Sequence, residues 1–310
     1  MSNFEVDLSV LCQRAIETRL RNHCWPAKKI ETQIDADASE KYGVKKGSTK
    51  TTKILVCHQS QPLWRKVVLS SDRMYQAWKK MTTPWRDGGF RLCCINASVD
   101  FLPNMEQLQD DYHAAVAECA ERWDVVVASQ EDRLKELFVA SEYPTANEVI
   151  EACWSELETQ PIQSAGDFRV ELPPEQMARL KAASERSTRK AVEVAMKEPW
   201  RRLHHVVQEM VVVLATPDKT FRDSLRDNIA AVCDLLPQLN VAGDPRLDEM
   251  AKKVKVALHD EFDPEGVRFA AWKRKSETHA TRHKAQIAQD NRVQACDKAN
   301  AILKEINAIM

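Results

Sequence analysis

Glycine is scarce in this sequence, with 7 residues among 310. Folds that wrap a loop around a phosphate or turn tightly between strands need glycine, because it adopts positive φ at little steric cost. The segment Gly43–Thr52 comes nearest to a phosphate loop, yet two residues separate Gly47 from Lys50, whereas a Walker A loop needs glycine next to lysine. The scarcity argues against a nucleotide-binding α/β fold, and we interpret this segment as a flexible basic loop.

Long hydrophobic runs are also missing. The longest apolar stretches, such as Met210–Ala215, fall far short of the ~20 residues of a membrane-spanning helix. The segment Met1–Val10 contains Glu5 and Asp7 and lacks the cationic start and apolar run of a secretory signal. The nine cysteines are odd in number and scattered, which is typical of reduced thiols in a cytosolic protein. We therefore expect a cytoplasmic protein without membrane contact.

Recognisable catalytic and metal-binding motifs are absent as well. His279 and His283 stand four residues apart on an expected helix, but no glutamate lies between them to act as the general base of a zinc hydrolase. The vicinal pairs lack the two-residue gap of a zinc site; they are His23-Cys24, Cys57-His58 and Cys93-Cys94. We predict no catalytic residues, no cofactor and no metal. A hydrolase built from scattered residues is the enzymatic alternative, and it requires a cleft where histidine, cysteine or carboxylate side chains converge.

Helical periodicity dominates what is present. Apolar residues recur every three or four positions in the stretches Val6–Cys24, Pro62–Met81, Met105–Val139, Pro173–Leu214, Lys219–Leu239 and Arg246–Leu258. A last helix is expected from Asp263 to Ile309, and Thr145 with Glu148 has the form of a capping box. We predict an all-α fold, an elongated bundle of long antiparallel helices with at most one small two-stranded β element.

The small β element would pair Phe90–Ile95 with Asp167–Leu172, where polar and apolar residues alternate. We expect three regions along the chain. Residues 1–95 form a basic, aromatic-rich helical region with a mobile loop at 35–53, residues 96–260 form the core of the bundle, and residues 261–310 form a basic C-terminal helix.

The charge is strongly divided along the chain, although the net charge is −1. Residues 41–91 hold twelve cations and two carboxylates, whereas residues 100–158 hold fifteen carboxylates and three cations. Such segments bind a polyanion, bind a basic partner, or neutralise each other within the fold. The sequence leaves all three arrangements open.

The basic segment interleaves cations with aromatic rings, the side chains from which single-stranded nucleic-acid sites are built. The candidate nucleic-acid-binding residues are Arg65, Lys66, Arg73, Trp78, Lys79, Lys80, Trp85 and Arg86. In this interpretation the cations contact phosphates, and Trp78 and Trp85 stack on bases. The alternative is that Trp64, Trp78 and Trp85 are core residues, as tryptophans in helical proteins usually are.

Several short signatures occur in combination, at Thr82–Gly89, Tyr143-Pro144, Asp167–Val170, Phe221–Asn228, Leu236–Asn240 and Asp244-Pro245. Over the range Ile54–Leu258 the chain resembles a family of uncharacterised helical proteins of tailed bacteriophages and prophages. Cys93–Ile95 departs from that pattern, because a more uniformly aliphatic strand leading into a proline is expected there. The resemblance implies a phage-encoded, non-structural protein of the host-cell cytoplasm, in some cases encoded beside a MoxR-type AAA+ ATPase. It transfers no catalytic residue.

We therefore expect a non-enzymatic accessory protein that acts by binding, with nucleic acid as its first candidate partner. The alternative is a protein–protein adaptor or inhibitor that uses the acidic segment Asp100–Glu158 to bind an AAA+ ATPase or a host enzyme. Long apolar stripes also favour a homo-oligomer.

Overall fold

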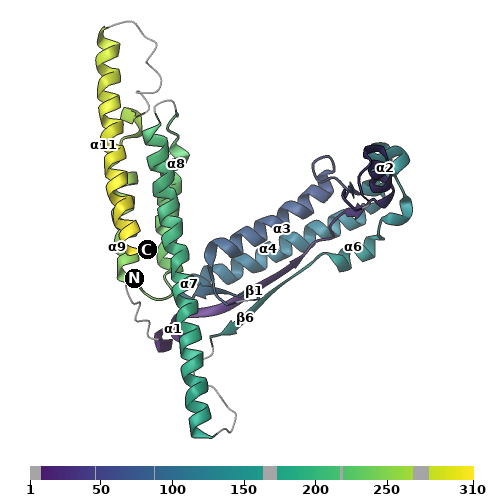
Figure 1. Ribbon diagram of the computed structural model, residues 1–310, viewed down its shortest axis with the longest axis horizontal. Helices are drawn as coiled ribbons and strands as arrows, with labels where there is room; N and C mark the ends of the chain where they lie inside the picture. Colours follow the sequence, from purple (N-terminus) through teal and green to yellow (C-terminus); the bar gives the residue numbers. More distant parts are fainter. Residues whose placement is uncertain (1–7, 46, 87, 163–172, 217–218, 268–278) are drawn as a thin grey trace. The chain divides into compact units, whose positions relative to one another are not determined.

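The computed structural model describes residues 8–45, 47–86, 88–162, 173–216, 219–267 and 279–310 (Figure 1). The chain divides into two compact units. Unit 1 contains Met1–Thr18, Met81–Val99 and Thr159–Met310, and unit 2 contains Arg19–Lys80 and Asp100–Glu158. Each unit is built from segments that are far apart in the sequence. The expected division into the consecutive regions 1–95, 96–260 and 261–310 stays a prediction.

The predicted all-α fold class is wrong. Helices make up 71% of the structure, but they accompany a four-stranded antiparallel sheet and a separate two-stranded sheet, an α+β arrangement. The larger sheet has the strand order β4 (Thr83–Pro84), β5 (Arg91–Cys94), β1 (Ala15–His23) and β6 (Trp154–Pro161). The smaller sheet pairs β2 (Lys28–Ile30) with β3 (Thr52–Ile54).

The error arises chiefly at the first predicted helix. Only Leu8–Arg14 is helical (α1), and the chain then continues as β1. In β1 the polar residues are not confined to one helical face, and pairing with β5 places Ala15 opposite Cys94. The Thr18 hydroxyl also donates to the carbonyl of Arg91 at 3.3 Å. Pairing across the sheet therefore overrides a helical spacing that extends only as far as Leu20.

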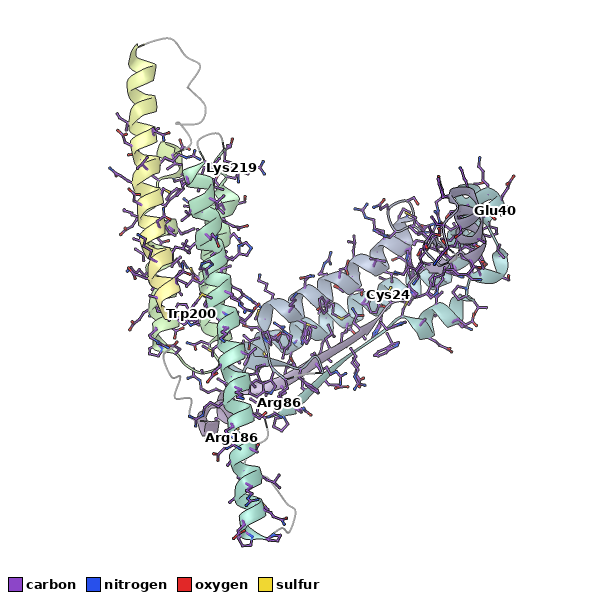
Figure 2. All side chains as sticks on the ribbon, in the orientation of Figure 1. Cys24, Glu40, Arg86, Arg186, Trp200 and Lys219 are labelled. Carbon is purple, nitrogen blue, oxygen red and sulfur yellow. The ribbon has the colours of Figure 1, made fainter. Side chains whose placement is uncertain are left out.

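In the remainder of unit 1 four helices pack together: α7 (Pro174–Ala215), α8 (Asp223–Leu239), α9 (Pro245–Lys255) with a π-helical turn at Val256–Asp260, and α11 (His279–Ile309). Helix α7 lies against both α8 and α11 (Figure 1). It begins directly after Pro173, as predicted, and continues through Pro199. Arg186 lies near its start and Trp200 farther along it (Figure 2). The core is formed by buried apolar residues that include Met196, Leu203, Met210, Ile229, Leu236, Leu247 and Ile306.

Unit 2 contains α2 (Thr32–Tyr42), α3 (Pro62–Met81), the greater part of α4 (Ile95–Glu121), α5 (Trp123–Leu134), the 3-10 turns Lys135–Leu137 and Ala140–Glu142, and α6 (Ala146–Ala152). Three tryptophans form its aromatic centre. The ring centroid of Trp25 lies 5.5 Å from that of Trp64 and 5.7 Å from that of Trp123, in edge-on arrangements. Aromatic rings prefer this geometry because the positive edge of one meets the negative face of the other.

Three local predictions in unit 2 have clear outcomes. The capping box is confirmed, because the Thr145 hydroxyl accepts from the Glu148 amide while the Glu148 carboxylate accepts from the Thr145 amide. The continuous helix Met105–Val139 is wrong, since Arg122 leaves helical geometry (φ −118°, ψ 27°) between α4 and α5. The loop predicted at 35–53 instead contains most of α2 and the start of β3.

Other expectations concern residues outside the described ranges. The strand expected at Asp167–Leu172 is one of them, and β5 pairs with β1 and β4 instead. The side chains of His279 and His283 also lie outside the description. Across the described part of the chain, every helix is too short or too polar to cross a lipid bilayer.

Candidate nucleic-acid interface

Helix α3 carries most of the predicted binding residues, and its two faces differ sharply. Trp64, Val67, Met74 and Trp78 are buried, and their spacings of three, four and seven residues place them on one side of the helix. The cations occupy the intervening positions. Arg65, Lys66, Arg73, Lys79 and Lys80 are therefore all exposed.

Helices α3 and α4 lie side by side (Figure 1). Three of these cations line one groove between the two helices, which we call the α3 groove. The groove encloses about 520 Å³, and its walls are Pro62, Arg65, Lys66, Leu69, Ser70 and Arg73 of α3 with Asp111 and Ala114 of α4. It contains three cations and one carboxylate. The local charge is therefore positive, although α4 belongs to the acidic segment.

The three cations of the α3 groove differ in how they are held. Lys66 Nζ forms an ion pair with Glu118 Oε2 at 2.5 Å, and this hydrogen bond lowers the pKa of the Glu118 carboxyl. Within the described part of the chain, the guanidinium groups of Arg65 and Arg73 have no ion-pair or hydrogen-bond partner. Arg65 and Arg73 are thus the two groove cations whose hydrogen-bonding capacity is open to a ligand.

The tryptophans occupy a different environment. Trp78 is 5% exposed and Trp85 is 6% exposed, and the Trp85 indole N–H donates to Glu17 Oε1 at 2.7 Å. A ring enclosed in this way cannot offer a face to a nucleobase. Both rings are core residues, as the alternative interpretation expected.

The eight predicted residues do not form one continuous group. Lys79 and Lys80 lie on the last turn of α3, outside the groove, where cations interact favourably with the negative end of the helix dipole. Trp85 and Arg86 belong to unit 1, and the Arg86 guanidinium lies 5.4 Å from the centroid of the Trp85 ring. Within unit 2, the predicted residues that line the α3 groove are Arg65, Lys66 and Arg73.

The basic and acidic segments also neutralise each other in part. The Lys53 side chain is 4% exposed and lies 2.6 Å from Glu142 Oε2 and 3.2 Å from Glu31 Oε2. Lys29 contacts the other oxygen of Glu142 at 3.2 Å. Lys53 therefore holds the two-stranded sheet against the segment after α5 and is not available to a polyanion.

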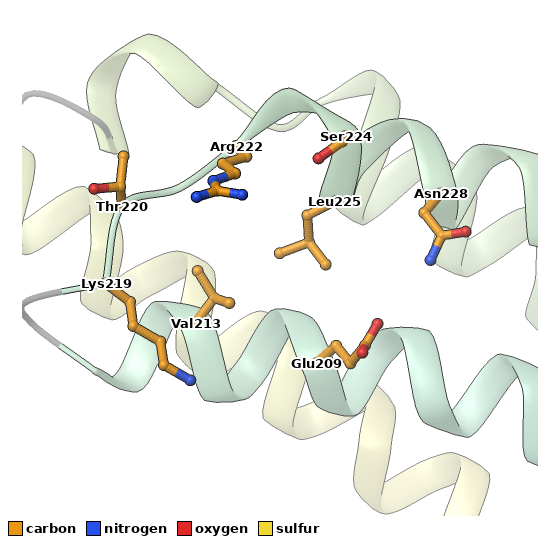
Figure 3. A pocket seen from close by; sticks show the side chains of 8 residues that line it. All are labelled: Glu209, Val213, Lys219, Thr220, Arg222, Ser224, Leu225 and Asn228. Atoms are coloured by element: carbon orange, nitrogen blue, oxygen red, sulfur yellow. The ribbon is translucent and has the colours of Figure 1, made fainter. Parts of the chain in front are cut away.

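A second groove lies in unit 1 between α7 and α8 (Figure 3). It encloses about 600 Å³ and is lined by Glu209, Val213, Lys219, Thr220, Arg222, Ser224, Leu225 and Asn228. Its charges are of both signs, and Figure 3 shows Glu209 and Asn228 projecting from opposite walls. A serine hydrolase needs its nucleophile in contact with a base, and among the described residues no hydrogen bond joins the Ser224 side chain in this groove to a base.

A cluster of thiols in unit 2 was missed by the sequence analysis. The backbone N–H of Trp25 donates to Cys153 Sγ at 3.4 Å, and the Tyr112 hydroxyl donates to the carbonyl of His23 at 2.7 Å. A hydrogen bond from the Cys24 thiol lowers the pKa of Cys153 to about 6. The same hydrogen bond, together with burial, raises the pKa of Cys24.

No short sequence pattern predicts this cluster, because Cys24 and Cys153 are far apart in the chain. Of the vicinal pairs noted in the sequence, only His23-Cys24 belongs to it. Among the described residues, three or more histidine, cysteine, aspartate or glutamate side chains are nowhere arranged to hold a metal ion.

Comparison with known proteins leaves the chain without an assigned family. No protein-family model matches the sequence, and neither a curated protein nor a solved structure shows significant similarity to it. The resemblance to phage proteins and the host-cell setting that it implies stay predictions.

Proposed function

We propose that unit 2 binds nucleic acid through the α3 groove and contacts the phosphate backbone rather than the bases. The observation that carries this proposal is the placement of Arg65 and Arg73 in one groove, where neither guanidinium has an ion-pair or hydrogen-bond partner among the described residues. They are eight residues apart on α3, about 12 Å along the helix axis. That distance suits two separate phosphates of one strand or duplex.

The chemistry of the two side chains supports phosphate as the ligand. A guanidinium presents its donors in a planar fork that matches phosphate oxygens and stays charged at every physiological pH. Each neutralised phosphate also releases condensed counterions, which makes the affinity fall as salt rises. Because Trp78 and Trp85 are buried, these two rings do not stack on bases, and contacts limited to phosphates should tolerate changes of base sequence.

The carboxylate of Asp111 limits the affinity. It lines the same groove and lies within reach of any phosphate held there, since charges interact over about 10 Å at ordinary salt. We therefore expect weak, non-specific binding. With two phosphates neutralised, the slope of log K against log salt is about −1.8 for duplex DNA and about −1.4 for a single strand.

The test is fluorescence anisotropy with labelled single-stranded and duplex oligonucleotides between low and physiological salt. The double variant Arg65→Gln/Arg73→Gln should lose most of the binding and nearly all of the salt dependence. The matched control is Arg186→Gln/Arg201→Gln, which removes the same charge from exposed positions on α7 in unit 1. Equal losses in the two double variants, or no binding by the unmodified chain at low salt, would refute the proposal.

A protein partner is the second candidate, and the surface of α4 and α5 favours it. Glu106, Asp110 and Asp111 are exposed along α4, and Val125 of α5 is 57% exposed. Exposed carboxylates and an exposed apolar side chain on neighbouring helices suit a basic protein surface. This adaptor role, including an AAA+ ATPase as the partner, predicts capture of a stoichiometric protein that survives nuclease treatment. Charge reversal at Glu106 and Asp110 should abolish that capture without weakening oligonucleotide binding.

A further inference from the structure

Two cysteines of unit 2 face each other at the ends of neighbouring strands. Strand β1 ends at His23, and β6 begins at Trp154. The two strands are antiparallel neighbours, and the His23 ring stacks on the Trp154 ring with centroids 6.3 Å apart. In antiparallel strands the residue after one member of a facing pair lies opposite the residue before the other. Cys24 and Cys153 therefore lie opposite each other.

Contacts around the sulfur atoms support this placement. The backbone N–H of Trp25, the residue after Cys24, reaches Cys153 Sγ at 3.4 Å. The Tyr112 hydroxyl donates to the carbonyl of His23, the residue before Cys24, at 2.7 Å. Facing residues of antiparallel strands have the Cα separation that a disulfide bond needs.

The two thiols are also unlike each other chemically. Cys153 is 3% exposed, and the hydrogen bond from the Cys24 thiol lowers its pKa, which favours the thiolate at this sulfur. Cys24, labelled in Figure 2, is half-buried. The hydrogen bond to Cys153 and burial raise its pKa, which favours the protonated thiol. A thiolate beside a protonated thiol is the pairing that a redox-active dithiol requires.

We propose that Cys24 and Cys153 form a reversible disulfide bond when the protein meets a peroxide. The Cys153 thiolate attacks one oxygen of hydrogen peroxide, the O–O bond breaks, and a sulfenic acid and hydroxide form. The Cys24 thiol then attacks the sulfenic sulfur, so that the S–S bond forms, the S–O bond breaks and water leaves. Two electrons pass from the sulfurs to the peroxide, and a thiol reductant reverses the step by exchange.

This inference is independent of nucleic-acid binding, because none of its residues lines the α3 groove. The new bond would join the end of β1 to the start of β6, next to Trp25 of the three-tryptophan centre. A disulfide beside an indole ring quenches its fluorescence, so oxidation should be visible in the emission of the intact protein.

The test uses the full, reduced chain, treated with a small excess of hydrogen peroxide at neutral pH. Free thiols are then alkylated in acid and denaturant, and peptides are identified by mass spectrometry. The peptides that contain Cys24 and Cys153 should be joined, with two hydrogen atoms lost, at least tenfold faster than Cys57 is oxidised. Cys57 is the most demanding control thiol, since it is half-buried and a backbone hydrogen bond lowers its pKa, so it should also react readily with peroxide.

Two variants sharpen the test. In Cys24→Ser no resolving thiol remains, so Cys153 should accumulate as sulfenic and then sulfinic acid, whereas Cys57→Ser should form the disulfide at the unmodified rate. The rate of the unmodified chain should rise with pH to a plateau, with its midpoint near 6. Recovery of both cysteines in alkylated form after Cys57 has been oxidised would overturn the inference. So would a bond from Cys153 to buried Cys119 instead, or no oxidation of any thiol.

Discussion

Arg292 of α11 is the buried charge on which the packing of unit 1 depends most visibly. The residue is 1% exposed, and its guanidinium donates to four backbone carbonyls at the end of α7 and just beyond it. Nε reaches Leu214 O at 2.8 Å, and Nη2 reaches Thr216 O at 2.6 Å, Lys219 O at 3.0 Å and Val213 O. The last carbonyls of a helix have no intrahelical donor, and here one side chain from another helix supplies it.

The variant Arg292→Met keeps the length of the side chain and removes every donor. Each buried carbonyl left without a donor costs about 1–3 kcal/mol. Removal of the guanidinium also removes the cost of burying its charge, which offsets part of that loss. We therefore expect unit 1 to lose about 2–4 kcal/mol of stability, and Arg292→Lys, which keeps the charge but loses the fork, to lose less.

Hydrogen exchange followed by mass spectrometry reads this change locally, which matters because a chain with two units need not unfold in one step. Protection of the second half of α7 should fall roughly 30- to 1,000-fold, since about 1.4 kcal/mol corresponds to a factor of ten. The control Arg201→Met alters an exposed residue of the same helix, and its effect should stay within about 0.5 kcal/mol. Equal protection in the Arg292 and Arg201 variants would contradict the reasoning.

Three further predictions concern unit 2. Thr145→Ala removes the capping box and should destabilise α6 by about 1 kcal/mol, seen as faster amide exchange there and nowhere else. Burial by itself raises the pKa of the Glu142 carboxyl, but hydrogen bonds from Lys53 and Lys29 outweigh it and hold the pKa below its usual value. The ionised Glu142 carboxylate should therefore stabilise the fold fully above about pH 4.3, the pKa of a glutamate in an unfolded chain. That contribution should be lost as the pH falls through the lower pKa of the folded state. In Glu142→Gln the free energy of unfolding should thus fall less steeply as the pH is lowered. Oxidation should stabilise unit 2 by up to roughly 5 kcal/mol, because the bond from Cys24 to Cys153 closes a loop of more than a hundred residues, and urea midpoints that do not differ between reduced and oxidised protein would count against it.

The sequence predicted local features well where neighbouring residues decide them. The capping box at Thr145 and the start of α7 after Pro173 depend on backbone chemistry within a few residues. The segment Ala15–His23 was mispredicted because its structure depends on pairing with β5, which lies far along the chain. The break at Arg122 shows the same limit, since the apolar spacing continues across a residue that is not helical.

The candidate site was predictable only in part for a similar reason. The periodicity of α3 separates buried from exposed positions, so exposure of Arg65 and Arg73 follows from the sequence. Whether a tryptophan is a core residue or a stacking surface depends on what covers it, and for Trp85 this is the sheet residue Glu17. The facing of Cys24 and Cys153 likewise requires the register of two distant strands.

The salt dependence of oligonucleotide binding tests the central claim most directly, because it counts the phosphates that the α3 groove neutralises. For duplex DNA the unmodified chain should give a slope of about −1.8 in log K against log salt, and Arg65→Gln/Arg73→Gln should give a slope close to zero. Identical slopes for these two proteins would contradict the assignment of the groove as the binding site.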